Sequence, residues 1–421
     1  MHTATNTIQI DKQQSLADIP LAVRGLGFPV GIAALVVSFL LAFFTMSDGQ
    51  GLAYFLNAYL VAFMFVLSIS LGCLFLTFVT LLTRAGWSVG MRRVAEMIAQ
   101  GVLPLMILFL PIALSVLFGS FALYPWNDPA LVSGSELLQK KSGYLNSTFF
   151  FVRYLIYSAV FIGLARYYFR TSLKQDSSGD PELTLQMERT STWGAYLFAG
   201  SLTFAAVDWM MSLQPDWFST IFGVYYFAGC AVGSLAFMII VLMTLQSRGL
   251  LRGVVNVEHY HDLGKLMFGF TCFWAYIAFS QFFLIWYANI PEETRFYLIR
   301  QGGQDLETAW PYVSLALIGG CFVLPFVGLM SRTIKRNRTT LFFWATFILV
   351  MRYVDMYWLI RPNYQPNPEV ILGPTFGLVD ILCVIGIVFV WLGSIVWIAS
   401  NRPIVAISDP RLPESLAFKN I

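Results

Sequence analysis

The segment LAYFLNAYLVAFMFVLSISLGCLFLTFVTLLT, residues 52–83, contains no charged side chain. A helix crosses the hydrocarbon core of a bilayer with about 20 predominantly apolar residues. This segment is longer than that, and its apolar character is continuous over its whole length. It therefore predicts a membrane-spanning helix that is tilted or extends beyond the membrane.

Other apolar stretches of spanning length occur on both sides of this segment. Together they give ten predicted spans, at 26–46, 52–83, 98–122, 145–166, 193–213, 218–246, 263–288, 309–331, 339–360 and 375–399. We expect an all-α polytopic membrane protein with one transmembrane domain over residues 26–399. Residues 1–25 are polar and lack the apolar core of a signal peptide, so they are predicted to form a tail. Residues 400–421 are predicted to form a second, cytoplasmic tail.

The composition excludes several classes of protein. The chain is 57% hydrophobic and only 12% charged, about half the charged fraction of a soluble domain. A net charge of +3, spread over short loops, is not a nucleic-acid footprint. The five cysteines lie in apolar segments without a C-x-x-C pair, and the three histidines are not spaced as haem ligands. No metal, haem or iron–sulfur site is therefore expected.

The loop charges predict the orientation of the chain in the membrane. Most basic residues lie in the loops on one side, whereas the other side carries only Lys140, Lys141, Arg295, Arg300 and Arg361. Because cytoplasmic loops are enriched in lysine and arginine, the first side is predicted to be cytoplasmic, with both termini inside. The other side is the outer side.

Polar side chains within the spans are the first candidate site, because charge in hydrocarbon is costly and usually functional. With this orientation they all fall in the outer half of the membrane: Arg153, Asp208, Gln281, Arg352, Asp355 and Asp380. Arg352 and Asp355 are three residues apart on one helix and can pair. Asp208 and Asp380 have no partner on their own helices. They are candidates for proton transfer or quinol binding, or for structural hydrogen bonding. We expect Asp208, Arg352, Asp355 and Asp380 to converge on one polar cavity.

A second polar cluster lies at the inner start of the seventh span: Glu258, His259, His261, Asp262 and Lys265. His259, Asp262 and Lys265 are spaced to share one helix face. A histidine there could admit protons from the cytoplasm. A charged first turn with a lysine reaching the interface explains the same pattern.

Two shorter patterns concern helix packing and internal repetition. Gly229 and Gly233 form a G-x-x-x-G motif, which favours close helix packing. Phe-Val-Arg153-Tyr154 in the fourth span is similar to Val-Met-Arg352-Tyr353 in the ninth, which hints at an internal repeat.

Three stretches resemble a known family. They are DWMMSLQPDWFSTIFGVYYFAG at 208–229, FWAYIAFSQFFLIWYANIPEET at 273–294 and DPRLPESL at 409–416. All three are similar to membrane subunits of alternative complex III, and within them to the smaller of two related subunits, quinone-binding subunit 2. The resemblance covers most of the chain from the second span onward. It places the chain among the NrfD/PsrC-like membrane anchors.

The resemblance implies a fold of two four-helix bundles with flanking helices, in the cytoplasmic membrane of a bacterium. It implies a complex that oxidises quinol, either menaquinol or ubiquinol, and passes the electrons to a cytochrome c or an oxidase. Partner subunits would carry the iron–sulfur clusters and c-type haems. A larger related membrane subunit would hold the better-supported quinol site. This chain would not be catalytic alone, and it would contact lipids but no nucleic acid.

Hydropathy alone leaves other functions open. Ten helices with buried charges also suit a stand-alone secondary transporter or a proton channel. A purely structural membrane anchor is a third possibility. Copurification with haem-bearing partners would separate a complex subunit from a stand-alone transporter.

Overall fold

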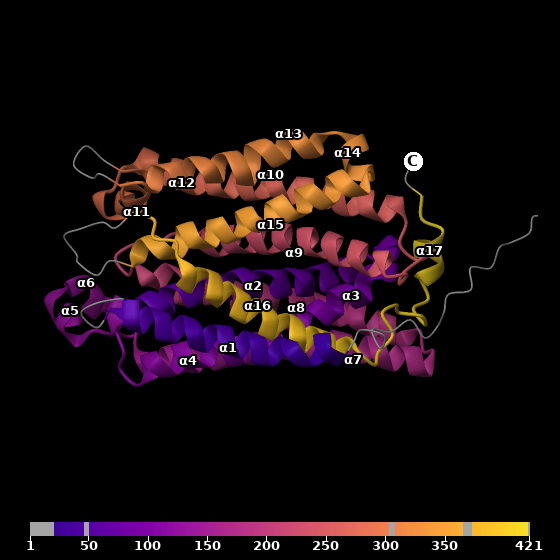
Figure 1. Ribbon diagram of the computed structural model, residues 1–421, viewed down its shortest axis with the longest axis horizontal. Coiled ribbons are helices and arrows are strands. Elements are labelled where there is room, and N and C mark those ends of the chain that lie inside the picture. The colour runs from indigo at the N-terminus through magenta and orange to yellow at the C-terminus, as the bar shows by residue number, and fades with distance from the viewer. Residues whose placement is uncertain (1–20, 46–49, 303–307, 365–372, 420–421) are drawn as a thin grey trace, which may run out of the picture.

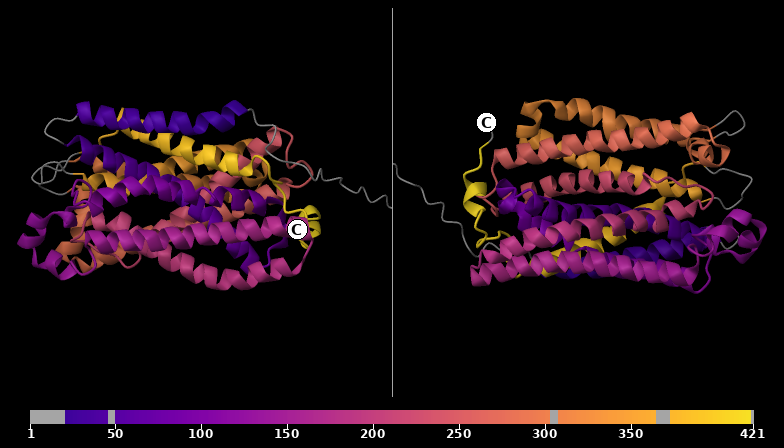
Figure 2. Two further views of the ribbon diagram at one scale, coloured as in Figure 1. Left: turned by 90° about the horizontal axis from the view of Figure 1, so that it is seen from below. Right: turned by 180° about the vertical axis from the view of Figure 1, so that it is seen from behind.

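The computed structural model describes residues 21–45, 50–302, 308–364 and 373–419, and within these ranges it contains helices and no strand. The long helices run side by side along the longest axis of the molecule (Figures 1 and 2). Residues 1–20 of the predicted N-terminal tail and the last two residues of the predicted C-terminal tail lie outside the described ranges.

The helices occur in the following order: α1 (Leu21–Thr45), α2 (Gly51–Leu82), η2 (Gly86–Ser88), α3 (Val89–Ala99), α4 (Val102–Leu117), η3 (Pro125–Asn127), α5 (Pro129–Gly134), α6 (Glu136–Lys141), α7 (Ser147–Ser178), α8 (Glu182–Trp209), η4 (Met211–Leu213), α9 (Phe222–Ser247), α10 (Val257–Ala288), α11 (Pro291–Gln301), α12 (Trp310–Leu317), η5 (Ile318–Val323), α13 (Leu324–Met330), α14 (Arg332–Arg336), α15 (Arg338–Ile360), η6 (Arg361–Asn363), α16 (Leu378–Ala399) and α17 (Leu412–Leu416). The element η5 is a π-helix, and it joins α12 and α13 into one continuous span.

Ten helical segments among the described residues are long and apolar enough to cross a membrane, which confirms the predicted all-α polytopic fold. They are Gly25–Thr45, Gly51–Leu82, Gly86–Leu117, Ser147–Ser178, Glu182–Leu213, Phe222–Ser247, Val257–Ala288, Trp310–Met330, Arg338–Asn363 and Leu378–Ala399. Each overlaps one of the ten predicted spans.

The third span differs most from its prediction. It begins at Gly86, whereas the sequence predicted a start near residue 98. The prediction was wrong because Arg92, Arg93 and Glu96 interrupt the apolar pattern, although all three side chains are buried inside the helical segment. A buried charge is tolerated in a helix when other charges pair with it.

Eight of the ten spans form two four-helix bundles. In the first bundle α2 contacts α3, α4 and α8, and α7 contacts α4 and α8. In the second bundle α9 contacts α10 and α15, while the span α12–α13 packs between α10 and α15. The two bundles meet mainly where α2 packs against α9. This arrangement agrees with the fold that the family resemblance implies.

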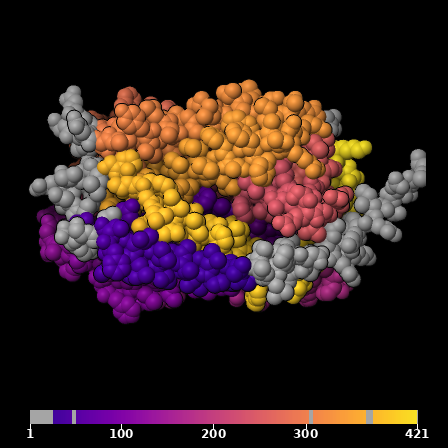
Figure 3. All heavy atoms as spheres, viewed as in Figure 1, coloured from indigo at the N-terminus to yellow at the C-terminus, as the bar shows by residue number. Residues whose placement is uncertain are grey.

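The first and last spans flank the bundles as a pair. Helix α1 packs along most of α16, and both contact α2. They lie side by side on one face of the molecule, where α1 is indigo and α16 is yellow (Figure 3). Gly27 and Gly393 allow this approach, because a methyl group on Gly27 would lie 2.8 Å from the Gly393 α-carbon.

The connections gather at the two ends of the molecule. Helices α5, α6 and α11 lie at one end, and α14 and α17 lie at the other (Figure 1). We call these the outer end and the inner end, following the orientation that the loop charges predict. Asp208 is the second-last residue of α8 and Asp380 is the third residue of α16, so both lie at the outer end.

Candidate functional site

Asp208 forms a buried ion pair with Arg153 within the first bundle, and both of its carboxylate oxygens accept hydrogen bonds. Arg153 of α7 donates two hydrogen bonds to its carboxylate, from Nε at 2.6 Å and from Nη2 at 3.1 Å. The Tyr157 hydroxyl donates a third at 2.7 Å. Both charged side chains are almost fully buried. We call Arg153, Tyr157 and Asp208, with the neighbouring Tyr144, the Asp208 group.

Tyr144 completes this group from the loop that precedes α7. Its carbonyl oxygen accepts a hydrogen bond from Nη1 of Arg153 at 2.8 Å. Its ring lies over the same guanidinium, 3.8 Å from centroid to Cζ, which is a cation–π contact. Burial and the nearby Asp208 carboxylate raise the pKa of Tyr144 to about 12. The hydroxyl therefore keeps its proton at neutral pH.

A pocket of about 280 Å³ at the outer end borders this group. Its wall includes Tyr144, whose ring contacts Arg153. It also includes Val207, which precedes Asp208 in the sequence, and Ser212, which donates a hydrogen bond to the Asp208 carbonyl. The remaining lining residues are mostly apolar or aromatic: Lys141, Leu145, Met211, Pro215, Trp217 and Phe218. Lys141 donates a hydrogen bond to the Pro215 carbonyl at 2.6 Å, and burial lowers the pKa of its ammonium group.

Asp355 belongs to a different ion pair, in the second bundle. Nη2 of Arg352 lies 2.7 Å from Oδ2 of Asp355, so the pairing predicted from their spacing is confirmed. The Tyr225 hydroxyl of α9 donates a 2.5 Å hydrogen bond to Oδ1. Trp274 of α10 lies beside the guanidinium, with 5.6 Å from ring centroid to Cζ. We call Tyr225, Trp274, Arg352 and Asp355 the Arg352 group.

Asp380 caps the start of α16 and has a third arginine as its partner. Its Oδ2 accepts hydrogen bonds from the Gly377 backbone at 3.0 Å and from the Tyr54 hydroxyl at 3.2 Å. Arg361 lies 3.7 Å from the same oxygen, and its guanidinium stacks on the Tyr54 ring at 4.0 Å. Arg361 was predicted to lie in an outer loop, but its side chain is fully buried.

The predicted common cavity is therefore wrong. Asp208, Asp355 and Asp380 have separate arginine partners, and each receives a hydrogen bond from a separate tyrosine. The cavity that Arg352 lines contains neither Asp208 nor Asp380. The reason is that a carboxylate is neutralised most effectively by an arginine in direct contact, which removes the need for a shared polar chamber.

Gln281, the sixth candidate, serves as a link between three segments. Its Oε1 accepts a hydrogen bond from Ser219 at 3.1 Å, and its Nε2 donates to the Tyr297 hydroxyl at 3.2 Å. Ser219 precedes α9, and Tyr297 lies in α11. Gln281 thus ties these outer elements to α10.

The sequence similarity around Arg153 and Arg352 does not reflect equivalent positions in the two bundles. Arg153 lies on the third helix of the first bundle and Arg352 on the fourth helix of the second, so these positions do not correspond. Val207-Asp208 and Val354-Asp355 are placed more alike, because each pair lies near the outer end of the last helix of its bundle. Both aspartates accept a tyrosine hydroxyl.

The predicted inner cluster is divided among several partners. Glu258 pairs with Arg336 of α14 through two contacts of 2.6 Å. Asp262 pairs with Lys265 at 2.5 Å, as their spacing suggested. His259 instead contacts Asn256, which caps α10, and the hydroxyl of Ser415 at 3.1 Å. His261 is also buried.

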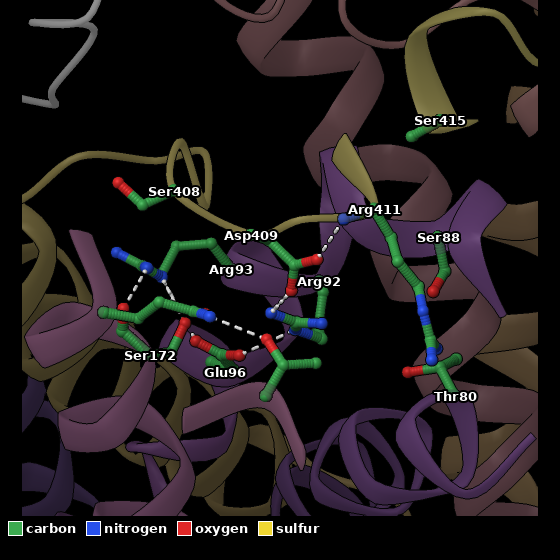
Figure 4. A network of polar contacts seen from close by, with 12 residues as sticks. Thr80, Ser88, Arg92, Arg93, Glu96, Ser172, Ser408, Asp409, Arg411 and Ser415 are labelled. Carbon is green, nitrogen blue, oxygen red and sulfur yellow. Dashed lines mark hydrogen bonds and ion pairs between the residues drawn. The ribbon is translucent and has the colours of Figure 1, made fainter. Parts of the chain in front are cut away.

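A buried charged network at the inner end was missed by sequence analysis (Figure 4). Glu96 accepts hydrogen bonds from Nε of Arg92 at 3.2 Å and from Nε of Arg93 at 3.1 Å. Arg92 also contacts Asp409 at 2.6 Å, and Arg93 contacts Asp176 at 2.8 Å. We call these five residues the Glu96 network. It joins α3 and α7 to the C-terminal segment.

The C-terminal segment crosses the inner ends of both bundles. Ser415 accepts a hydrogen bond from the Gly90 backbone at 3.1 Å and donates one to the Trp87 carbonyl at 2.8 Å. The Phe418 carbonyl accepts from Asn256 at 3.2 Å. The expected C-terminal tail is thus packed onto the protein through at least Phe418. The signal in the sequence was the motif at 409–416, which was noted only as part of the family resemblance.

No family model matches this chain, and no curated protein matches it either.

Proposed function

We propose that this chain is a cofactor-free integral membrane subunit of a bacterial quinol oxidoreductase of the alternative complex III type. Partner subunits would hold the haems and iron–sulfur clusters, and a larger related membrane subunit would be its neighbour. The long aromatic motifs at 208–229 and 273–294 support this proposal, and so does the arrangement of two four-helix bundles with a flanking pair.

The observation that carries the proposal is the outer pocket beside the Asp208 group. A quinol has an apolar ring and two hydroxyl groups. A pocket of about 280 Å³ suits a ring of that kind better than a whole isoprenoid quinol, since ligand pockets are commonly 300–1,000 Å³. Trp217 and Phe218 offer apolar and aromatic surface, and Tyr144 offers a protonated hydroxyl beside a buried carboxylate.

The geometry favours binding and orientation by this chain over catalysis by it. Asp208 accepts three hydrogen bonds, two of them from Arg153 and one from Tyr157. Its oxygens are therefore engaged by protein groups and do not face a ligand directly. Tyr144 would therefore position a quinol hydroxyl, Asp208 and Arg153 would fix Tyr144, and the electrons would leave through the partners.

Purification tests the assignment to a complex. When the chain is tagged and purified from its native membrane, haem-bearing and iron–sulfur subunits should copurify in fixed ratio. A chain that purifies alone at full yield would contradict the proposal. The same preparation in liposomes would then test the stand-alone transporter.

Two substitutions test the pocket within the intact complex. Val207→Phe adds a ring to the pocket wall without changing charge, and should raise KM for quinol. Val224→Phe, on an exposed position of α9, is the matched control and should leave KM unchanged. Asp208→Asn should slow quinol oxidation by releasing Arg153 and Tyr144. Normal assembly with unchanged KM and turnover in both Val207→Phe and Asp208→Asn would favour a structural anchor.

A further inference from the structure

Arg352 lies in the interior of the second bundle, between helices α9, α10, α15 and the π-helix η5. Its side chain is 3% exposed. Gly229 of α9 faces the guanidinium, and Trp274 of α10 lies beside it. A guanidinium carries five N–H donors and cannot lose its charge in a protein. Each donor in this position therefore needs an acceptor.

Arg352 has fewer hydrogen bonds than the buried arginines Arg153 and Arg300. Within the described residues, none of its three side-chain nitrogens has a hydrogen-bond partner of acceptable geometry, although Nη2 is in ionic contact with Asp355. Arg153 uses all three of its nitrogens, on Asp208 and the Tyr144 carbonyl. Arg300 also uses all three, on backbone carbonyls.

A cavity borders Arg352 on the side away from the outer end. It is lined by Val232, Thr271, Trp274, Cys321, Ile348, Met351 and Arg352, and its volume is about 10 Å³. That volume is at the lower limit for one water molecule. The Thr271 hydroxyl donates to the Met267 carbonyl at 2.8 Å, so its oxygen can still accept a hydrogen bond.

The wall formed by η5 explains why space exists here. A π-helix has a wider turn than an α-helix, and such segments are frequent at functional sites. Cys321 lies within this π-helix and lines the cavity, while its thiol contacts the Met351 carbonyl at 3.6 Å. The widened turn of η5 and the buried Arg352 therefore border the same cavity.

We propose that this cavity is a binding site for one internal water molecule. The water accepts a hydrogen bond from Arg352 and donates one to Thr271. Such a molecule satisfies a donor that protein groups leave unpaired, which is the usual role of buried water. The Arg352–Asp355 pair is then hydrated. In the Arg153–Asp208 pair, by contrast, every side-chain nitrogen of Arg153 donates to a protein group. This inference does not depend on the proposed quinol function.

The consequence is a polar chain through the second bundle. It runs from Tyr225 through Asp355 and Arg352 to the water and Thr271, and so from the outer part of the bundle toward its centre. A hydrated ion pair can exchange hydrogen-bond partners without leaving a charge bare. The first bundle offers no such freedom at Asp208.

Hydroxyl-radical footprinting of the purified full-length chain tests the site. A short X-ray pulse converts bound water to hydroxyl radicals, which oxidise adjacent sulfur and indole groups first. Three such side chains line the cavity: Trp274, Cys321 and Met351. Met64 and Cys73 are fully buried and do not line it, and they serve as internal controls. We expect Cys321 to be oxidised several-fold faster than Cys73, whereas Met351, which is only partly buried, is compared with itself in the variant described next.

A cavity-filling variant separates bound water from solvent leakage. Val232→Ile adds a methylene group to the cavity wall, and should reduce oxidation of Cys321 and Met351 toward the control rates. Val224→Ile makes the same change on an exposed position of α9 and should have no effect. Equal oxidation of cavity and control residues in the unmodified chain would overturn the proposal. The proposal would also be overturned if oxidation of Cys321 and Met351 were unchanged in Val232→Ile. That variant must first show native elution and native helicity.

Discussion

The α-carbon of Gly229 in α9 faces the guanidinium of Arg352 in α15, and a methyl group at position 229 would overlap its Nη2 atom. Gly233, one turn further along α9, leaves 3.9 Å between such a methyl group and Cγ of the same arginine. The G-x-x-x-G motif was predicted to bring two helices close together. Its first glycine instead makes room for a buried charged side chain.

Gly229→Ala should therefore destabilise the chain, whereas Gly233→Ala should be nearly neutral. The extra methyl group at 229 must displace Arg352 from Asp355, and overpacking of this kind costs about 1–3 kcal/mol. Thermal unfolding of the purified chain in detergent measures the difference. Equal loss in both variants would show that the two glycines act through helix packing alone.

The Arg153–Asp208 pair should show strong coupling in a double-mutant cycle. Asp208→Asn alone leaves a buried arginine without its counter-charge, at a cost of about 3–5 kcal/mol. Adding Arg153→Met to Asp208→Asn should recover much of that loss. The exposed pair Arg189–Glu182 is the control, because its coupling should not exceed about 1 kcal/mol. Similar coupling energies for the two pairs would argue against a desolvated Asp208 group.

The sequence allowed the ten spans and the Arg352–Asp355 pair to be predicted, because both depend on local patterns. Apolar length identifies a span, and a spacing of three residues identifies a shared helix face. The partners of Asp208 and Asp380 are Arg153 and Arg361, which come from other helices. No local pattern determines such a contact, so these carboxylates were expected to share a cavity.

The Glu96 network shows the same limit at the inner end. Arg92 and Arg93 resemble loop residues, because two adjacent basic side chains commonly mark a membrane interface. Arg92 is buried because Asp409, more than three hundred positions away in the sequence, lies over it, and Arg93 pairs with Asp176 of α7. The separation of 317 residues removes any short-range signal of this pairing.

Cysteine labelling in intact cells tests the orientation. Thr333→Cys in α14 should react with a membrane-impermeant maleimide only after the cells are opened, because the basic residues around it predict a cytoplasmic position. Ser133→Cys in α5, at the outer end, should react from outside. Both positions are exposed. Labelling of Thr333→Cys in intact cells would reverse the orientation.

The charges of the Glu96 network are unequal, which leads to the last prediction. Two arginines face three carboxylates, namely Glu96, Asp176 and Asp409. Glu96 is the only one of the three that contacts both arginines within the described part of the chain. Its loss and the loss of Asp409 should therefore have different effects.

Glu96→Gln should cost about 3–5 kcal/mol, because one of the two arginine contacts loses its acceptor inside a buried site. Asp409→Asn keeps one oxygen for Arg92 and gives up only the part-buried hydrogen bond from the Arg411 backbone N–H, so it should cost only about 1 kcal/mol. Glu414→Gln, at an exposed position of α17, is the control for the C-terminal segment. Thermal unfolding of the three purified variants ranks them by their loss of stability. If Asp409→Asn is as damaging as Glu96→Gln, the ionic attachment of the C-terminal segment matters more than the number of arginines that one carboxylate contacts.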